Sequence, residues 1–416
     1  MIARRFALPV VAMALLAAAC SDDGSSGSSG TSTPTATDAP ATDAPTTTEA
    51  PTTTAAPTTT LDPAAVATTY ADYGPHPVGV TTLQLAKGPK VEVWYPAAEG
   101  SEGTDSYDVR DFVPEAIKAV LTADIPAGYS YPGSRDAAVA EGSFPVVLFS
   151  HGFTGIRLQS TFLTAHLASW GMIVVSPDHP SRDLTNVLGG TASGDRADAV
   201  DDLLQSLELI SAAGTDPASP FNGRVDAERV IAVGHSAGGG TVLGAAADDR
   251  IDGYVSLASG AFLGGGDTSG STTTTAPPLP DKPSFFMAGS VDFVVPAETA
   301  TRPAFEAAPS PSLLWIIEGV GHNGFDDFCT FGNGTGIIGI AEASGLGPLL
   351  EAQPQLRTLG EDGCIEPAVP VDTTFPIITH GVTAWVLAQF GVDEAAVGIG
   401  PDFADAFAVP VEIEEK

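Results

Sequence analysis

The sequence predicts an α/β domain with a mainly parallel central sheet. Short, continuous apolar runs recur between residues 145 and 319, and such runs are typical of strands that are covered on both faces. Stretches with helical spacing of apolar residues lie between these runs. Alternating strands and helices indicate parallel strands joined by right-handed crossovers. A glycine-rich turn between one strand and the next helix places a serine at the carboxyl end of this sheet.

Eight runs are predicted as strands. Residues 80–85 and 90–96 are separated by a short Gly-Pro turn, so they are expected to pair antiparallel. The other six strands are predicted at 145–150, 172–176, 229–234, 254–258, 284–289 and 313–319. Helices are predicted at 158–171, 195–214, 236–247, 297–308 and 375–391. In the second of these, Ala199, Leu203 and Leu207 share one face and Gly214 ends the helix.

Residues 1–20 have the pattern of an export signal. Arg4 and Arg5 precede an apolar stretch too short for a membrane span, and small residues lead into Cys20. The end of this segment, "LLAAAC", resembles a bacterial lipoprotein signal. It predicts that Cys20 is lipidated and that the protein is exported and held at the cell surface by its N-terminal lipid alone. An ordinary secretory signal, and hence a secreted protein, is the alternative.

Residues 21–62 are rich in Ser, Thr, Pro, Ala and Asp and have almost nothing large and apolar. Such a segment cannot bury a core, so a disordered linker is expected there and a folded domain at 63–416. Two segments break the strand–helix rhythm of that domain. Residues 264–283 read as a flexible loop, and an insertion from about 323 to 373 follows the eighth strand.

Charge and cysteine content limit the partners. The chain has 17 Lys and Arg against 51 Asp and Glu, a formal net charge of −34, so phosphate repulsion argues against a nucleic-acid partner. Cys329 and Cys364 lie within the insertion, and an isolated pair in an oxidising compartment is most simply a disulfide. This bond would stabilise the fold by about 3–4 kcal/mol. No ligands with metal-site spacing lie nearby, so neither a metal nor a cofactor is expected. The oligomeric state is left open.

Ser236 is the predicted nucleophile. The pentapeptide GHSAG, residues 234–238, fits G-x-S-x-G. Alone the pattern is weak, because glycine-rich sequences produce it by chance, and a structural serine in a turn is the alternative. Here a predicted strand precedes the serine and a predicted helix begins at it, as the strained nucleophile elbow requires. That context exposes the hydroxyl at the carboxyl end of the sheet and favours a nucleophile.

A serine hydroxyl needs a base to take its proton. His322 is predicted to be this base, because it follows the eighth strand on a glycine-flanked loop and fits the chain order Ser…Asp…His. His380, within the last predicted helix, is the second candidate. Asp292, after the seventh strand, is predicted to orient the imidazole. It could instead cap the helix that begins near Ala297.

Two backbone N–H groups are predicted to bind the oxyanion. Ala237 supplies one, as the residue after the nucleophile. Phe153 supplies the other, from the loop FSHGFTG at 149–155 after the third strand. A simple strand-to-helix turn is the alternative interpretation of that loop, and both interpretations can hold together.

Four segments resemble the bacterial cutinase-like polyester hydrolase and platelet-activating-factor acetylhydrolase-like branch of the α/β-hydrolase superfamily: PVVLFSHGFTGIRLQSTFLTAHLASWGMIVVSPDHP, GHSAGGGT, GSVDFVVP and EGVGHNGF. The resemblance implies an α/β-hydrolase fold with an eight-stranded, mostly parallel sheet, and an esterase without a metal cofactor. By motif it places the nucleophile, acid and base on Ser236, Asp292 and His322, and the oxyanion donors on Phe153 and Ala237.

The chain departs from the polyester hydrolases at several positions. Phe153 stands where they usually have tyrosine and Ala237 where they have methionine. No clamp tryptophan is evident ahead of Ser236, and the insertion with its two cysteines replaces a short loop. These departures disfavour a polyester substrate and leave ester hydrolysis in place.

The function expected is that of an exported serine esterase, which hydrolyses short-chain, neutral or apolar carboxylic esters, small or polymeric, through an acyl-enzyme. A phospholipid acetylhydrolase, a lipase, a polyester hydrolase and an amidase are the nearer alternatives. A surface binding lipoprotein on a hydrolase scaffold is the non-enzymatic alternative, because a fold does not by itself confer activity. The occupied triad positions favour the enzyme.

Overall fold

The computed structural model describes residues 62–260, 278–393 and 396–416. They belong to one compact unit that spans Leu61–Lys416. The predicted signal, its Cys20 and nearly all of the predicted linker lie outside the described residues, as does most of the predicted loop at 264–283. No helix within the described ranges is long and apolar enough to cross a membrane.

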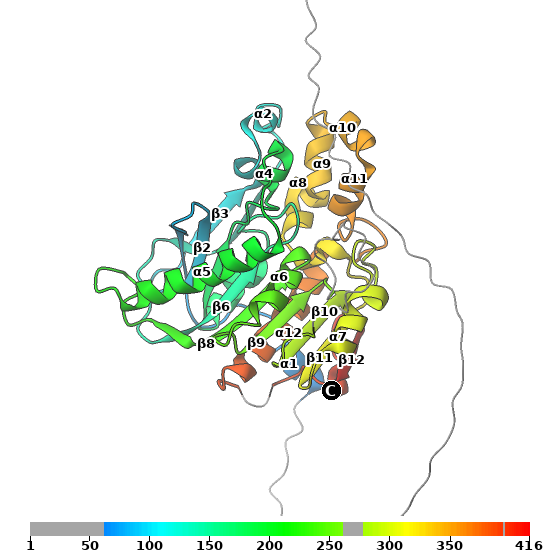
Figure 1. Cartoon of the computed structure of the whole chain (residues 1–416). Coiled ribbons are helices and arrows are strands. Elements are labelled where there is room, and N and C mark those ends of the chain that lie inside the picture. Colours follow the sequence, from blue (N-terminus) through cyan, green and yellow to red (C-terminus); the bar gives the residue numbers. More distant parts are fainter. Residues whose placement is uncertain (1–61, 261–277, 394–395) are drawn as a thin grey trace, which may run out of the picture. The chain divides into compact units, whose positions relative to one another are not determined.

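A ten-stranded sheet forms the centre of the domain (Figure 1). Each of the eight predicted runs is a strand of this sheet. Their observed bounds are β1 Val78–Gln84, β2 Lys90–Pro96, β6 Phe144–Ser150, β7 Ile173–Pro177, β8 Val225–His235, β9 Gly253–Leu257, β10 Ser284–Gly289 and β11 Ser312–Ile317. The predicted number of eight strands is wrong, because two short strands, β5 (Ser134–Arg135) and β12 (Val411–Glu415), extend the two edges.

The strand order is β12-β11-β10-β9-β8-β6-β7-β2-β1-β5. The five neighbouring pairs from β7 to β11 are parallel. As predicted, β1 and β2 pair antiparallel, and β2–β7 and β11–β12 do so as well. The sheet is therefore mostly parallel at its centre, with antiparallel strands toward both edges.

The chain changes direction across the sheet at β6. From β6 it passes through α3 (Thr161–Ser169) to β7 on one side, and then through α5 (Arg196–Thr215) to β8 on the other side. In open α/β sheets, ligands bind outside the carboxyl ends of the strands at such a switch point. The loops after β6 and β8, which contain the predicted oxyanion and nucleophile segments, leave the sheet there.

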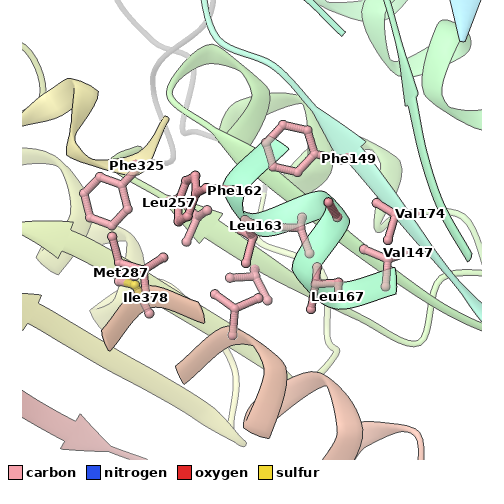
Figure 2. Packing of buried hydrophobic residues seen from close by; sticks show 14 of the residues in the cluster. Val147, Phe149, Phe162, Leu163, Leu167, Val174, Leu257, Met287, Phe325 and Ile378 are labelled. Carbon is pink, nitrogen blue, oxygen red and sulfur yellow. The ribbon is translucent and has the colours of Figure 1, made fainter. Parts of the chain in front are cut away.

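Helices cover both faces of the sheet. On one face α3 contacts β2 and β7 and packs against α12 (Val371–Gln389). On the other face lie α5, α6 (Ala237–Ala245) and α7 (Arg302–Ala307). Figure 2 shows part of the core under α3, in which Phe162 and Leu163 lie near strand side chains and near Ile378 of α12.

Neighbouring strand residues are buried on opposite faces. Val147 packs in the core beneath α3 and α12, whereas Val146 packs in the separate core beneath α5 and α6. This is the alternation that a strand geometry of period two requires. Burial on both faces explains why these strands are continuous apolar runs in the sequence.

The predicted insertion is helical. After β11 the chain forms α8 (Phe331–Gly334), α9 (Gly336–Ala343), α10 (Gly347–Ala352) and α11 (Pro354–Glu361) before it enters α12. A disulfide joins Cys329 to Cys364 and closes this segment. The sequence predicts that the insertion follows the last strand. This is wrong, because β12 comes after the insertion in the chain.

A second, smaller group of elements comes from the chain between β2 and β6. The strands β3 (Thr104–Asp108) and β4 (Gly128–Pro132) form a two-stranded sheet, with α2 (Glu115–Lys118) between them. In Figure 1, α2 and α4 (Leu184–Gly189) lie toward the same end of the domain as α9 and α10. These elements surround the carboxyl ends of the central strands.

Candidate active site

Ser236 occupies the sharp turn between β8 and α6. Its backbone has φ 56° and ψ −122°, a left-handed conformation that a residue with a side chain rarely adopts. The two glycines of the motif are required by close packing. A Cβ atom at Gly234 would lie 2.3 Å from the Gly238 carbonyl oxygen, and one at Gly238 would lie 1.9 Å from the Ser150 carbonyl oxygen. This strained turn has the geometry that the sequence predicts for a nucleophile elbow.

The structure brings the three predicted catalytic side chains together. His322 Nε2 lies 2.9 Å from Ser236 Oγ, and His322 Nδ1 lies 2.9 Å from Asp292 Oδ2. All three residues are buried, with Ser236 the most exposed at 8%. In this arrangement the hydroxyl donates to Nε2 and the Nδ1–H group donates to the carboxylate. A serine in such a chain can transfer its proton to the imidazole.

Asp292 is held by the turn that follows it. Its Oδ1 atom accepts hydrogen bonds from the backbone N–H groups of Val294 (2.9 Å) and Val295 (2.6 Å). Neither amide belongs to the helical segment that begins at Ala297, so Asp292 is not a cap of that segment. One carboxylate oxygen therefore fixes the loop after β10, while the other meets the imidazole.

The environment of His322 favours its charged form. Burial by itself lowers the pKa of His322, but the nearby carboxylates of Asp292, Asp362 and Asp326 outweigh that effect and raise the pKa above its ordinary value. Asp292 contributes both its charge and a hydrogen bond. The imidazolium that forms when serine loses its proton is thereby stabilised.

Asp362, which comes from the insertion, was missed by sequence reasoning. Its Oδ1 atom accepts from the His322 backbone N–H at 2.9 Å, and its Oδ2 atom accepts from those of Phe293 (2.7 Å) and Val294 (3.0 Å). One side chain thus joins the loop of the acid to the loop of the base. No motif marks it, because it lies 40 residues after His322 in a segment without a recognisable pattern.

Gln159 and His235 form a second support, beneath the base. Gln159 Nε2 donates to His235 Nδ1 and to Asp326 Oδ2, both at 2.8 Å, and its Oε1 accepts from the Gly152 N–H. His235 Nε2 then donates to the backbone carbonyl of His322 at 3.0 Å. Burial and the neighbouring His322 hold the pKa of His235 well below its ordinary value, so it stays neutral. These contacts link the loop after β6 to the loop of the base.

The two predicted oxyanion donors lie beside the nucleophile. Ala237 is the first residue of α6, and Phe153 lines the same pocket as Ser236. A Cβ atom at Gly152 would come within 3.1 Å of Ser236 Cβ, which shows how closely the loop after β6 approaches. In the described part of the chain, neither the Phe153 nor the Ala237 backbone N–H donates to another protein group. Both are available to a substrate oxygen.

A second Ser–His–Asp chain lies deeper in the domain. Ser150 Oγ is 2.9 Å from His179 Nε2, and His179 Nδ1 is 3.0 Å from Asp202 Oδ2. Ser150 is fully buried, does not line the pocket, and accepts a hydrogen bond from Arg182 at 2.8 Å. Burial and the charge of Arg182 keep the pKa of His179 well below its ordinary value. This chain is structural, since no substrate can reach its hydroxyl.

His380, the second candidate for the base, is distant from this chemistry. It is buried within α12, where its Nδ1 accepts from the Tyr70 backbone N–H at 3.2 Å and its Nε2 donates to the Gly398 carbonyl at 3.3 Å. It packs the N-terminal segment against the domain. Across the described residues, no group of three or more His, Cys, Asp or Glu side chains is placed to hold a metal ion.

A pocket opens at Ser236. Its empty volume is about 1070 Å³, which includes space open to solvent. Ser236, His322 and Phe153 lie at its catalytic end, together with Thr154 and Gln159. Its remaining walls come mainly from the insertion, from α4 and from the segment around α2. A substrate in this pocket would present its reacting group to Ser236.

The sheet order and the elbow at its switch point define an α/β-hydrolase-type protein. A family model described as PETase, PET hydrolase-like, matches residues 128–322, from β4 to His322. The esterase YjfP of Escherichia coli (strain K12) is 32% identical over 133 residues, which is 31% of this chain and 48% of that protein. The chain thus matches about half the length of this curated relative.

A solved structure, a ferulic acid esterase from Streptomyces cinnamoneus, covers 75% of this chain and 90% of its own. Its TM-score is 0.52 and its sequence identity 20%, so it shows the likeness of the fold alone. The family match and the esterase relative confirm the predicted resemblance to the cutinase-like branch of the α/β-hydrolase superfamily, and the solved structure agrees with the fold.

Proposed function

We propose that this protein is a serine hydrolase of neutral, apolar carboxylic esters. The observation that supports this most directly is the hydrogen-bonded chain from Ser236 through His322 to Asp292, with 2.9 Å at each step. Ser236 and His322 line a largely apolar pocket. The similarity to a PET hydrolase-like family and to an esterase agrees with it.

In the first half of the reaction, Ser236 Oγ attacks the ester carbonyl carbon while its proton moves to His322 Nε2. Asp292 stabilises the imidazolium so formed. The carbonyl oxygen becomes an oxyanion and accepts from the N–H groups of Phe153 and Ala237. The C–O bond to the alcohol then breaks, the alcohol leaves with the proton from His322, and Ser236 carries the acyl group.

In the second half, water replaces the alcohol. His322 Nε2 takes a proton from the water as its oxygen attacks the acyl carbon, and the same two N–H groups bind the new oxyanion. Collapse of this intermediate returns the proton to Ser236 and releases the carboxylic acid. The acid ionises at neutral pH.

The test compares Ser236 with Ser150, since each of these serines is hydrogen-bonded to a histidine. Ser236→Ala should abolish turnover of p-nitrophenyl butyrate and labelling by a fluorophosphonate probe, with the fold intact by circular dichroism. Ser150→Ala is the matched control, and a folded Ser150→Ala protein should still be labelled. Labelling that persists in Ser236→Ala would refute the proposed nucleophile. Absence of any labelling or turnover in the wild type would favour the non-enzymatic binding protein.

The family match favours a second candidate, a polyester hydrolase. Phe153 and Phe328 are the only Phe, Tyr or Trp residues among the described residues that line the pocket, so few rings are available to stack against an aromatic polyester. A comparison of films of poly(ethylene terephthalate) and of an aliphatic polyester such as polycaprolactone tests this candidate. We expect release from the aliphatic film to be the faster.

A further inference from the structure

The pocket at Ser236 has a marked division of chemistry along its wall. Polar side chains, such as Thr154, Gln159 and Asn323, belong to the segments that carry the catalytic residues. The rest of the wall is aliphatic: 14 of its 25 residues are Val, Ile or Leu. Among the described residues of this wall none is Asp, Glu, Lys or Arg, although the chain as a whole has a net charge of −34.

The aliphatic wall is assembled from three separate parts of the chain. The segment from Val109 to Leu121 around α2 supplies one side, and Leu184 and Leu188 of α4 supply another. The insertion helices α9, α10 and α11 supply the remainder. A hydrogen bond from the Thr122 backbone N–H to Ser344 Oγ, at 3.4 Å, ties the first part to the insertion.

Many of these apolar side chains are only partly buried. Leu346, Leu349, Leu356 and Leu359 of the insertion are of intermediate exposure, as are Ile117 and Leu121 opposite them. Apolar surface left open to water is unfavourable by about 25 cal/mol per Å². A ligand that covers it would recover this free energy, and its other end would lie at Ser236.

We infer that the pocket binds a medium-to-long hydrocarbon chain of the ester, and that the helical insertion sets the preference for this chain. This inference rests on the proposed ester hydrolysis, and it departs from the short-chain preference expected from the sequence. The wall is aliphatic and uncharged, so it suits a flexible alkyl chain and has no cation to hold a carboxylate. The hydrocarbon chain can belong to the acyl part or to the alcohol part of the ester.

Two series of substrates show whether the bound hydrocarbon chain belongs to the acyl part or to the alcohol part of the ester. In the first, p-nitrophenyl esters carry acetyl, butyryl, hexanoyl, octanoyl and decanoyl groups. In the second, n-alkyl acetates carry alcohols of the same lengths. All are measured below their critical micelle concentrations. Within the series whose chain enters the pocket, kcat/KM should rise beyond butyryl or butyl by up to about fourfold per methylene, as expected for burial of a CH₂ group.

A variant of the insertion tests the position of the chain. Leu349 lines the pocket from α10, whereas Ala352 on the same helix is exposed and does not. Leu349→Trp should lower kcat/KM for the longest good substrate at least tenfold more than it lowers kcat/KM for the acetate ester. Ala352→Trp should change neither. A thermal melt of each variant reports whether it is folded.

The outcomes separate the inference from the proposed function. If acetate is turned over through Ser236 but both series are flat or fall beyond butyryl, the hydrocarbon site is refuted and the esterase stands. Equal losses for acetate and long esters in a folded Leu349→Trp protein would also refute it, because the helix would then act only on the catalytic residues. If no ester is turned over at all, the proposed function itself has failed.

Discussion

His322 is held by two carboxylates, Asp292 at its ring and Asp362 at its backbone. We predict that Asp362→Asn lowers kcat/KM for p-nitrophenyl butyrate on the order of tenfold or more, because misplaced catalytic groups lose much of their effect. Asp362 also raises the pKa of His322 by its charge. The acid limb of the pH–rate profile should therefore move to lower pH. Glu366→Gln, at an exposed position nearby, is the control. An unchanged limb in Asp362→Asn would indicate a purely structural role.

The pH dependence of activity follows from the same residue. His322 must be neutral to take the serine proton, and its pKa is raised. We therefore predict that kcat/KM of the wild type falls as pH decreases, with a midpoint above the ordinary histidine value of about 6.5. Asp292→Asn should reduce kcat on the order of 10⁴-fold, as in the serine protease example. A midpoint below 6 in the wild type would contradict the raised pKa.

The contribution of His322 to the stability of the folded state should change with pH in the direction opposite to that of kcat/KM. A group whose pKa is higher in the folded state binds its proton more tightly when folded. The contribution of His322 to stability is thus fully present below its unfolded pKa and is lost as pH rises through its folded pKa. Full protonation of His322 therefore favours the folded state while it removes the catalytic base.

Ser236, Asp292 and His322 could be placed from the sequence because each follows a strongly apolar strand at a glycine-rich turn. The strand order of the fold then brings those turns together. Asp362 and Gln159 could not be placed in this way. Their effect depends on hydrogen bonds to groups far away in the chain, which are backbone N–H groups for Asp362 and side chains for Gln159. No local pattern records such contacts.

Among the elements, the insertion depends on its disulfide. Cys329 and Cys364 are separated by 35 residues, and a closed loop of that length stabilises a fold by about 3–4 kcal/mol in the chain-entropy model. We predict that the double variant Cys329→Ser, Cys364→Ser loses about this free energy in urea unfolding. Because Asp362 lies two residues before Cys364, turnover of p-nitrophenyl acetate should fall as well. A loss of stability below about 1 kcal/mol would show that the insertion is held mainly by packing.

The strands that sequence analysis missed share a cause. β12 has the sequence VEIEE, in which Val411 and Ile413 are buried and Glu412 between them is exposed. This period-two pattern was a usable signal, but it is short and acidic. β3 and β4, TDSYD and GYSYP, are polar and pair only with each other. Pattern reasoning depends on burial, so it finds central strands more readily than peripheral ones.

At the scale of the whole molecule, we expect the negative net charge of the protein to favour neutral esters over anionic esters as substrates. The net charge is −34, and in the part of the chain that the structure describes no Lys or Arg side chain lines the pocket. We predict that p-nitrophenyl butyrate is hydrolysed with a higher kcat/KM than p-nitrophenyl hemisuccinate, a similar ester with a free carboxylate. Salt screens such repulsion, so the ratio should narrow at high ionic strength. Equal rates at low salt would mean that the approach to Ser236 is shielded from the surface charge.

The insertion both lines the pocket and supports His322, and this limits which substitutions the insertion can accept. Its helices line the pocket, and Asp362 near its end accepts a hydrogen bond from the His322 backbone N–H. A different segment grafted between residues 331 and 361 would preserve this hydrogen bond only if it placed Asp362 at the same position. If the proposed function and the inferred hydrocarbon site hold, substrate selectivity and turnover are coupled through this one segment, so a redesign of either must take account of the other.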